Sequence, residues 1–160
     1  MGCDVLTAQP TELDLKQGAI RFYAPGERPP WVSSAQKVLY EDRLGELAVS
    51  VKVDGKPYKL LVDTGADHSL LLGAPKAPGD AYAPGQDATG EVIDMWQGSG
   101  MLEVGNEIAA RPLLKAPSWP YFKGTLDALG GGLSGLLGLS SIPGQKLFID
   151  AASRTLAFPG

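Results

Sequence analysis

The chain has 160 residues, 44% of them hydrophobic, which is enough for one domain with its own core. Its 18 acidic and 14 basic residues give a net charge of −4 with no basic cluster, which excludes the surface that nucleic-acid binding requires. No apolar run approaches the roughly 18 residues of a transmembrane helix. The 21 glycines and 13 prolines favour an all-β protein with many turns.

The sequence contains one cysteine, Cys3, and one histidine, His68, so neither an intrachain disulfide nor a metal site is predicted. Cys3 follows Gly2, and bacterial lipoproteins mature at a cysteine after a small residue. Two interpretations stay open. Either the protein belongs to the periplasm or cell envelope and meets the membrane through a lipid on Cys3, or it is cytoplasmic and Cys3 is simply an exposed terminal residue.

Residues 1–40 show few periodic segments, and we interpret them as an N-terminal extension that acts as a tether, an arm or a propeptide-like segment. Within this extension, residues 19–25 favour one short strand, and residues 25–31 form a proline-rich connector. The remaining residues, 41–160, are expected to form the folded domain.

The clearest local pattern begins near Leu44. Apolar and polar residues alternate from Leu47 to Asp54, as in a half-buried strand. Asp54-Gly55 then predicts a tight turn, because both turn residues need positive φ. The return strand, residues 57–62, ends at Asp63.

Further strands are expected at residues 90–96 and 101–114, with turns at 98–100 and 105–106. A terminal hairpin is predicted over residues 146–158.

The polar, proline-bearing stretches 75–90 and 115–124 are expected to be loops. Only residues 66–73 and 139–142 leave room for a short helix.

Asp63-Thr64-Gly65 follows the apolar strand and precedes a second apolar run. Together with "GLLGL" and "FIDAASRTLAF" downstream, "LLVDTGADHSLL" resembles the retropepsin-like aspartic proteases, the single-domain relatives of pepsin. The resemblance covers about residues 44–158. It implies an all-β fold, a closed barrel with one short helix, that assembles as a twofold dimer.

The resemblance also implies an aspartic endopeptidase that cleaves polypeptides without a metal or cofactor. One carboxylate deprotonates a water while a second protonates the substrate. Two such carboxylates share one proton, since both cannot ionise when so close. The sequence has a single Asp-Thr-Gly, so the pair requires a homodimer with one Asp63 from each subunit.

The roles of neighbouring residues follow from the same resemblance. Asp63 is the expected catalytic carboxylate, Thr64 ties the two active-site loops together, and Gly65 permits a close backbone approach. Ala66 and Asp67 are expected at the substrate, with Asp67 contacting its backbone. The residues expected to pack under the loop and hold it are Leu136, Leu137 and Gly138.

The family covers its substrate with a β-hairpin flap. Residues 85–96 are the best candidate for it, with Ala88, Thr89 and Gly90 near the tip as substrate-binding residues.

Three alternatives are weaker. Asp67, His68 and Ser69 have the residue types of a hydrolase triad, but adjacent residues cannot converge in that geometry. "GGGLSG" (130–135) fits a dinucleotide fingerprint, but Pro143 and Gly144 leave no helix of useful length after it. The third alternative is a peptide-binding or scaffold module that keeps the fold and does not cut.

Overall fold

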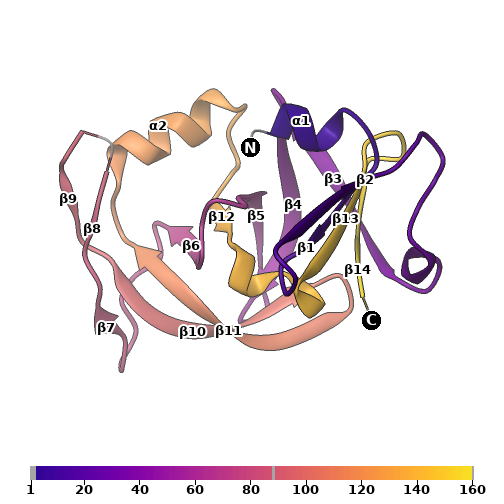
Figure 1. Cartoon of the computed structure of the whole chain (residues 1–160). Coiled ribbons are helices and arrows are strands. Elements are labelled where there is room, and N and C mark those ends of the chain that lie inside the picture. The colour runs from indigo at the N-terminus through magenta and orange to yellow at the C-terminus, as the bar shows by residue number, and fades with distance from the viewer. Residues whose placement is uncertain (1–2, 88, 160) are drawn as a thin grey trace.

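The computed structural model describes residues 3–87 and 89–159, and it is mostly β-structure (Figure 1). Its strands are β1 (Thr11–Asp14), β2 (Ala19–Phe22), β3 (Gln36–Arg43), β4 (Glu46–Val53), β5 (Lys56–Val62), β6 (Ser69–Leu72), β7 (Ala81–Tyr82), β8 (Gly85–Gln86), β9 (Val92–Ile93), β10 (Trp96–Val104), β11 (Glu107–Ala116), β12 (Gly135–Leu137), β13 (Lys146–Asp150) and β14 (Thr155–Phe158). The α-helices are α1 (Cys3–Thr7) and α2 (Pro120–Ala128), and the 3-10 helices are η1 (Pro30–Ser33), η2 (Leu139–Ser141) and η3 (Pro143–Gln145).

Part of the main sheet closes into a barrel. The strands follow one another in the order β4, β5, β12, β6, β11 and β10, and β10 pairs again with β4 through Leu102 and Val53. This closure leaves no free edge within the ring. The predicted all-β class with a closed barrel is confirmed.

The β4–β5 hairpin forms as predicted. Asp54 and Gly55 take φ values of 50° and 76°, the left-handed conformation that such a turn requires. Val49, Val51 and Val53 point into the core, while Ser50 and Lys52 are exposed. The hairpin therefore leads the chain directly to Asp63.

The prediction of a turn at residues 98–100 is wrong, because strand β10 continues through these residues without a break. A Cβ atom on Gly98 would lie 2.0 Å from Asp80 Oδ1, and one on Gly100 would lie 3.0 Å from Val53 Cγ1. These glycines make room for neighbouring side chains and do not mark a turn. The turn predicted at Gly105 and Asn106 is present between β10 and β11.

Of the two positions predicted for a short helix, residues 139–142 contain a 3-10 helix over 139–141, whereas residues 69–72 form strand β6. The main helix, α2, was not predicted and lies partly in the loop expected at 115–124. Pro120 occupies the first turn of α2, where the missing N–H costs nothing. The described residues thus hold two α-helices, not the single short one expected.

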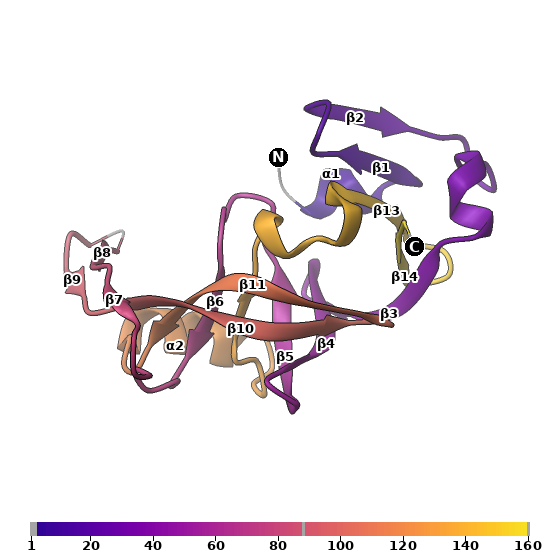
Figure 2. The same cartoon turned by 90° about the horizontal axis from the view of Figure 1, so that it is seen from below.

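The N-terminal residues pack against the end of the chain (Figure 2). Strand β1 pairs antiparallel with β13, and β3 pairs with β14. Both edges of the C-terminal hairpin are therefore covered within the same chain. Leu6 and Leu13 join the main core, which binds this segment to the rest of the fold.

A buried ionic cluster supports this packing. The Glu12 carboxylate accepts hydrogen bonds from Tyr23 Oη at 2.7 Å and Trp31 Nε1 at 2.9 Å. Lys146 Nζ lies 2.9 Å from Asp14 Oδ2 and 3.5 Å from Glu12 Oε1. Arg21 Nη1 on β2 lies 3.5 Å from Glu12 Oε2 and 3.7 Å from Asp14 Oδ2, so the two charges on β1 are paired by one cation from β13 and one from β2, as buried charges require.

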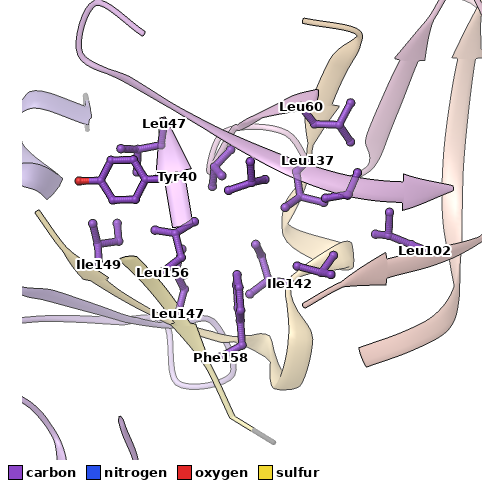
Figure 3. Close-up of a cluster of buried hydrophobic side chains, with 14 of the residues drawn as sticks. Tyr40, Leu47, Leu60, Leu102, Leu137, Ile142, Leu147, Ile149, Leu156 and Phe158 are labelled. Atoms are coloured by element: carbon purple, nitrogen blue, oxygen red, sulfur yellow. The ribbon is translucent and has the colours of Figure 1, made fainter. Parts of the chain in front are cut away.

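The main core lies between the barrel and the C-terminal hairpin (Figure 3). Leu137 is fully buried in it together with Leu60, Ile142 and Phe158. Because Leu137 belongs to the segment predicted to support Asp63, the core reaches directly to the candidate site.

Candidate active site

Asp63 follows the buried end of β5. Leu60, Leu61 and Val62 are all buried, whereas Asp63 is half-buried. The backbone N–H of Gly65 donates to Asp63 Oδ1 at 2.8 Å, and the N–H of Ala66 donates to the Asp63 carbonyl at 3.3 Å. The Asp-Thr-Gly segment is a tight turn in which the backbone orients its own carboxylate.

This turn is held by the segment around β12. The N–H of Asp63 donates to the Leu137 carbonyl at 3.0 Å, and the N–H of Leu139 donates to the Ala66 carbonyl at 2.8 Å. β12 also runs parallel to β5, with Leu136 opposite Leu61 and Leu137 opposite Val62. The two chain segments therefore form one rigid support for the carboxylate.

Gly138 lies where no side chain fits. A Cβ atom there would lie 2.5 Å from both the carbonyl carbon and the carbonyl oxygen of His68, and 2.9 Å from the Ala66 carbonyl oxygen. These are backbone atoms that cannot swing away. Glycine at this position allows the supporting segment to approach the Asp63 turn.

A cleft of about 510 Å³ opens beside Asp63. Apolar side chains dominate its walls, and its polar groups include two carboxylates. The lining residues are Glu46, Leu61, Val62, Asp63, Thr64, Gly65, Phe122, Thr125, Leu129 and Leu136. Such a cleft can bind an apolar group and hold it next to a carboxylate.

Sequence reasoning missed the α2 wall of this cleft and Glu46. Phe122, Leu126 and Leu129 recur at the spacing of one helical face. Leu126 is buried against Ala48 and Leu61, and Phe122 and Leu129 pack beside it. That periodicity could have predicted the helix, but the prolines that precede it led to the expectation of a loop. The signal for Glu46 was the predicted β4–β5 hairpin, whose register places Ala48 opposite Leu61 and so brings Glu46 to the same end as Asp63.

The other predicted site residues lie around the turn. Thr64 lines the cleft and Ala66 is half-buried, while the Asp67 side chain is 86% exposed. His68 Nδ1 lies 3.3 Å from Asp67 Oδ2. Their roles toward a substrate or a second subunit stay predictions.

The predicted flap region contains a small separate hairpin, β8–β9. Ala88 lies outside the described residues. Thr89 Oγ1 donates to Asp87 Oδ1 at 2.6 Å, and this hydrogen bond is the main reason that the pKa of Asp87 is lowered. Within the described part of the chain, Val92 and Ile93 share a pocket with Pro117, Ser118 and Pro120. The lining of the Asp63 cleft includes neither Thr89 nor Gly90.

Residues 3–87 and 89–159 contain no group of three or more histidine, cysteine, aspartate or glutamate side chains that could hold a metal ion. Over the same residues, no helix is long and apolar enough to cross a membrane. Gly2, on which the lipoprotein prediction depends, lies outside those residues.

Comparisons with known proteins find similarity to retroviral polyproteins. The chain is 33% identical over 79 residues to the Gag-Pol polyproteins of gibbon ape leukemia virus, woolly monkey sarcoma virus and koala retrovirus. The match covers 49% of this chain and 5% of each polyprotein. No family model matches the chain. The similarity is consistent with a region like a retroviral protease.

Proposed function

We propose that this protein is an aspartic endopeptidase whose active site combines Asp63 from two copies of the chain. The observation that carries the proposal is the Asp63 turn itself. Its carboxylate accepts a hydrogen bond from the Gly65 N–H and faces an apolar cleft, and the Asp63 backbone N–H donates to the Leu137 carbonyl. The partial similarity to Gag-Pol polyproteins adds support.

The chemistry follows from the pairing. One Asp63 takes a proton from a water, whose oxygen attacks the peptide carbonyl, and the other Asp63 gives the shared proton to the carbonyl oxygen. When the tetrahedral intermediate collapses, the first Asp63 passes the proton from water to the leaving amine, and the second recovers a proton from the hydroxyl that becomes the carboxyl product. A single chain supplies one such carboxylate on this turn. The second copy therefore completes the reaction, and Thr64 is the residue proposed to join the two turns.

The cleft indicates which peptides fit. Phe122, Leu129 and Leu136 form apolar walls next to Asp63. A large apolar side chain beside the scissile bond would bury its surface there, at about 25 cal/mol per Å². Peptides with such a residue are the proposed substrates.

A peptide-binding module without cleavage is the second candidate. Two observations favour it: the cleft is present in one chain, and the C-terminal hairpin has both edges paired within that chain. Such a module would bind peptides as a monomer.

The Asp63→Asn variant distinguishes these functions. It keeps the shape of the side chain and removes both the base and the shared proton. Cleavage of fluorescein-labelled casein should fall by several orders of magnitude, while circular dichroism and thermal unfolding stay close to wild type. The matched control, Asp67→Asn, should keep measurable turnover. Near-normal cleavage by Asp63→Asn would rule out the proposed mechanism.

A further inference from the structure

A buried serine lies directly behind the active-site turn. Ser69, the first residue of β6, has no exposed surface, and Ser141 in η2 is 1% exposed. Ser69 Oγ accepts a hydrogen bond from the Gly138 N–H at 3.0 Å and donates to Ser141 Oγ at 2.7 Å. These bonds link the start of β6 to Gly138, which follows β12, and to η2.

The position of Gly138 gives this contact its importance. Gly138 follows Leu137, whose carbonyl accepts the Asp63 N–H, and precedes Leu139, whose N–H bonds to Ala66. Its lack of a side chain means that it can be held only through its backbone. The Ser69 hydroxyl is the side chain that binds its N–H.

We propose that Ser69 is a positioning residue for Asp63. It fixes the Gly138 backbone, and the Gly138 backbone fixes the Leu137 carbonyl against the Asp63 N–H. This inference rests on the proposed protease function for its catalytic consequence. The structural part, that Ser69 holds the Asp63 turn, can be measured without any substrate.

Replacing Ser69 by alanine tests both the structural role of Ser69 and its consequence for catalysis. Ser69→Ala leaves the Gly138 N–H buried without its acceptor, which allows the supporting segment to shift. A misplacement of about 1 Å can cost on the order of 100-fold in rate. We therefore expect kcat for casein cleavage to fall about 10- to 100-fold with KM nearly unchanged, because the cleft walls stay in place.

The matched control is Thr11→Val in β1. Thr11 is also fully buried, and its hydroxyl donates to the Gln9 carbonyl at 2.9 Å, remote in the fold from Asp63. This variant also loses one buried hydroxyl, so it should lose stability and keep the wild-type kcat. Ser69→Cys fills the same space with a weak acceptor. It should lose kcat as Ser69→Ala does, and it replaces that variant if alanine prevents folding.

Amide hydrogen exchange provides the readout that does not need activity. In Ser69→Ala or Ser69→Cys, exchange at the Asp63 and Gly138 amides should rise at least about 10-fold, while amides of the β4–β5 hairpin stay protected. In Thr11→Val, the Asp63 amide should stay as in wild type. Unchanged exchange at Asp63 in a folded Ser69 variant would overturn the proposal, as would full kcat in Ser69→Cys. If wild type cleaves no casein, the protease function fails, whereas the exchange result still decides the role of Ser69.

Discussion

The N–H of Asp63 and the carbonyl of Leu137 form a hydrogen bond of 3.0 Å, and the Leu137 side chain is fully buried in the main core. One residue therefore connects the hydrophobic core to the candidate catalytic carboxylate. The neighbouring Leu136 faces the other way and lines the cleft. Adjacent residues of β12 thus serve stability and binding separately.

This division can be tested with two alanine variants. Leu137→Ala should lower the free energy of unfolding by about 2–5 kcal/mol, as expected for a leucine removed from a packed core. Leu136→Ala should cost less stability and raise KM for peptides with large apolar residues. Urea unfolding and peptide kinetics measure the two effects. Equal stability losses with no change in KM would contradict this assignment.

Replacing two different glycines by alanine should change the stability of the protein in opposite directions. Gly138→Ala places a Cβ atom 2.5 Å from the His68 backbone, so we expect a loss of about 1–3 kcal/mol together with loss of activity. A Cβ atom on Gly124 in α2 would have nothing within 4 Å of it. Gly124→Ala should therefore gain stability, by up to about 1 kcal/mol, because alanine favours the helix. Thermal unfolding compares the two, and a stable, active Gly138→Ala variant would refute the close packing.

The ionic cluster at β1 predicts a dependence of stability on pH. Burial raises the pKa of Glu12, but the hydrogen bonds from Tyr23 and Trp31 and the charges of Lys146 and Arg21 outweigh it, so the pKa is lowered overall. The pKa of Asp14 is lowered chiefly by its hydrogen bond with Lys146. These carboxylates stabilise the fold above their unfolded pKa values, near 4, and this contribution is lost as pH falls through the lower folded values.

The Glu12→Gln variant tests this contribution. At about pH 7 it should lose about 1–3 kcal/mol, since the hydrogen bonds to the charged carboxylate are weakened. The difference from wild type should shrink as the pH falls below about 4, where wild type also loses the charge. Urea unfolding across this range provides the measurement. A difference that stays constant with pH would show that the Glu12 charge adds nothing.

The α2 wall predicts a change in specificity. Phe122→Ala enlarges the cleft and removes apolar contact, so kcat/KM for peptides with a large apolar residue should fall about 10- to 200-fold. Peptides with a small residue at the same place should be affected far less. The control is Tyr121→Ala, because Tyr121 is exposed and does not line the cleft. An equal loss for both peptide classes would argue against α2 as a specificity wall.

Local patterns predict the β4–β5 hairpin because alternation and an Asp-Gly turn are short-range signals. Strand β1 has no such signal. Glutamate and aspartate are usually exposed, yet Glu12 and Asp14 are both buried. They can be buried because Lys146, which is distant in the sequence, forms ion pairs with both. The position of α2 beside Asp63 is hidden from the sequence in the same way, since its contacts with Ala48 and Leu61 join distant parts of the chain. Short-range patterns cannot show contacts of this kind.

The central claim is that two Asp63 carboxylates share one active site, and mixing wild type with the Asp63→Asn variant tests it most directly. Native mass spectrometry would first establish that the two exchange subunits. Since only pairs of wild-type subunits are active, activity per wild-type subunit should fall in proportion to the wild-type fraction, to about one half in an equimolar mixture. Activity per wild-type subunit that stays constant at every fraction would contradict the shared site.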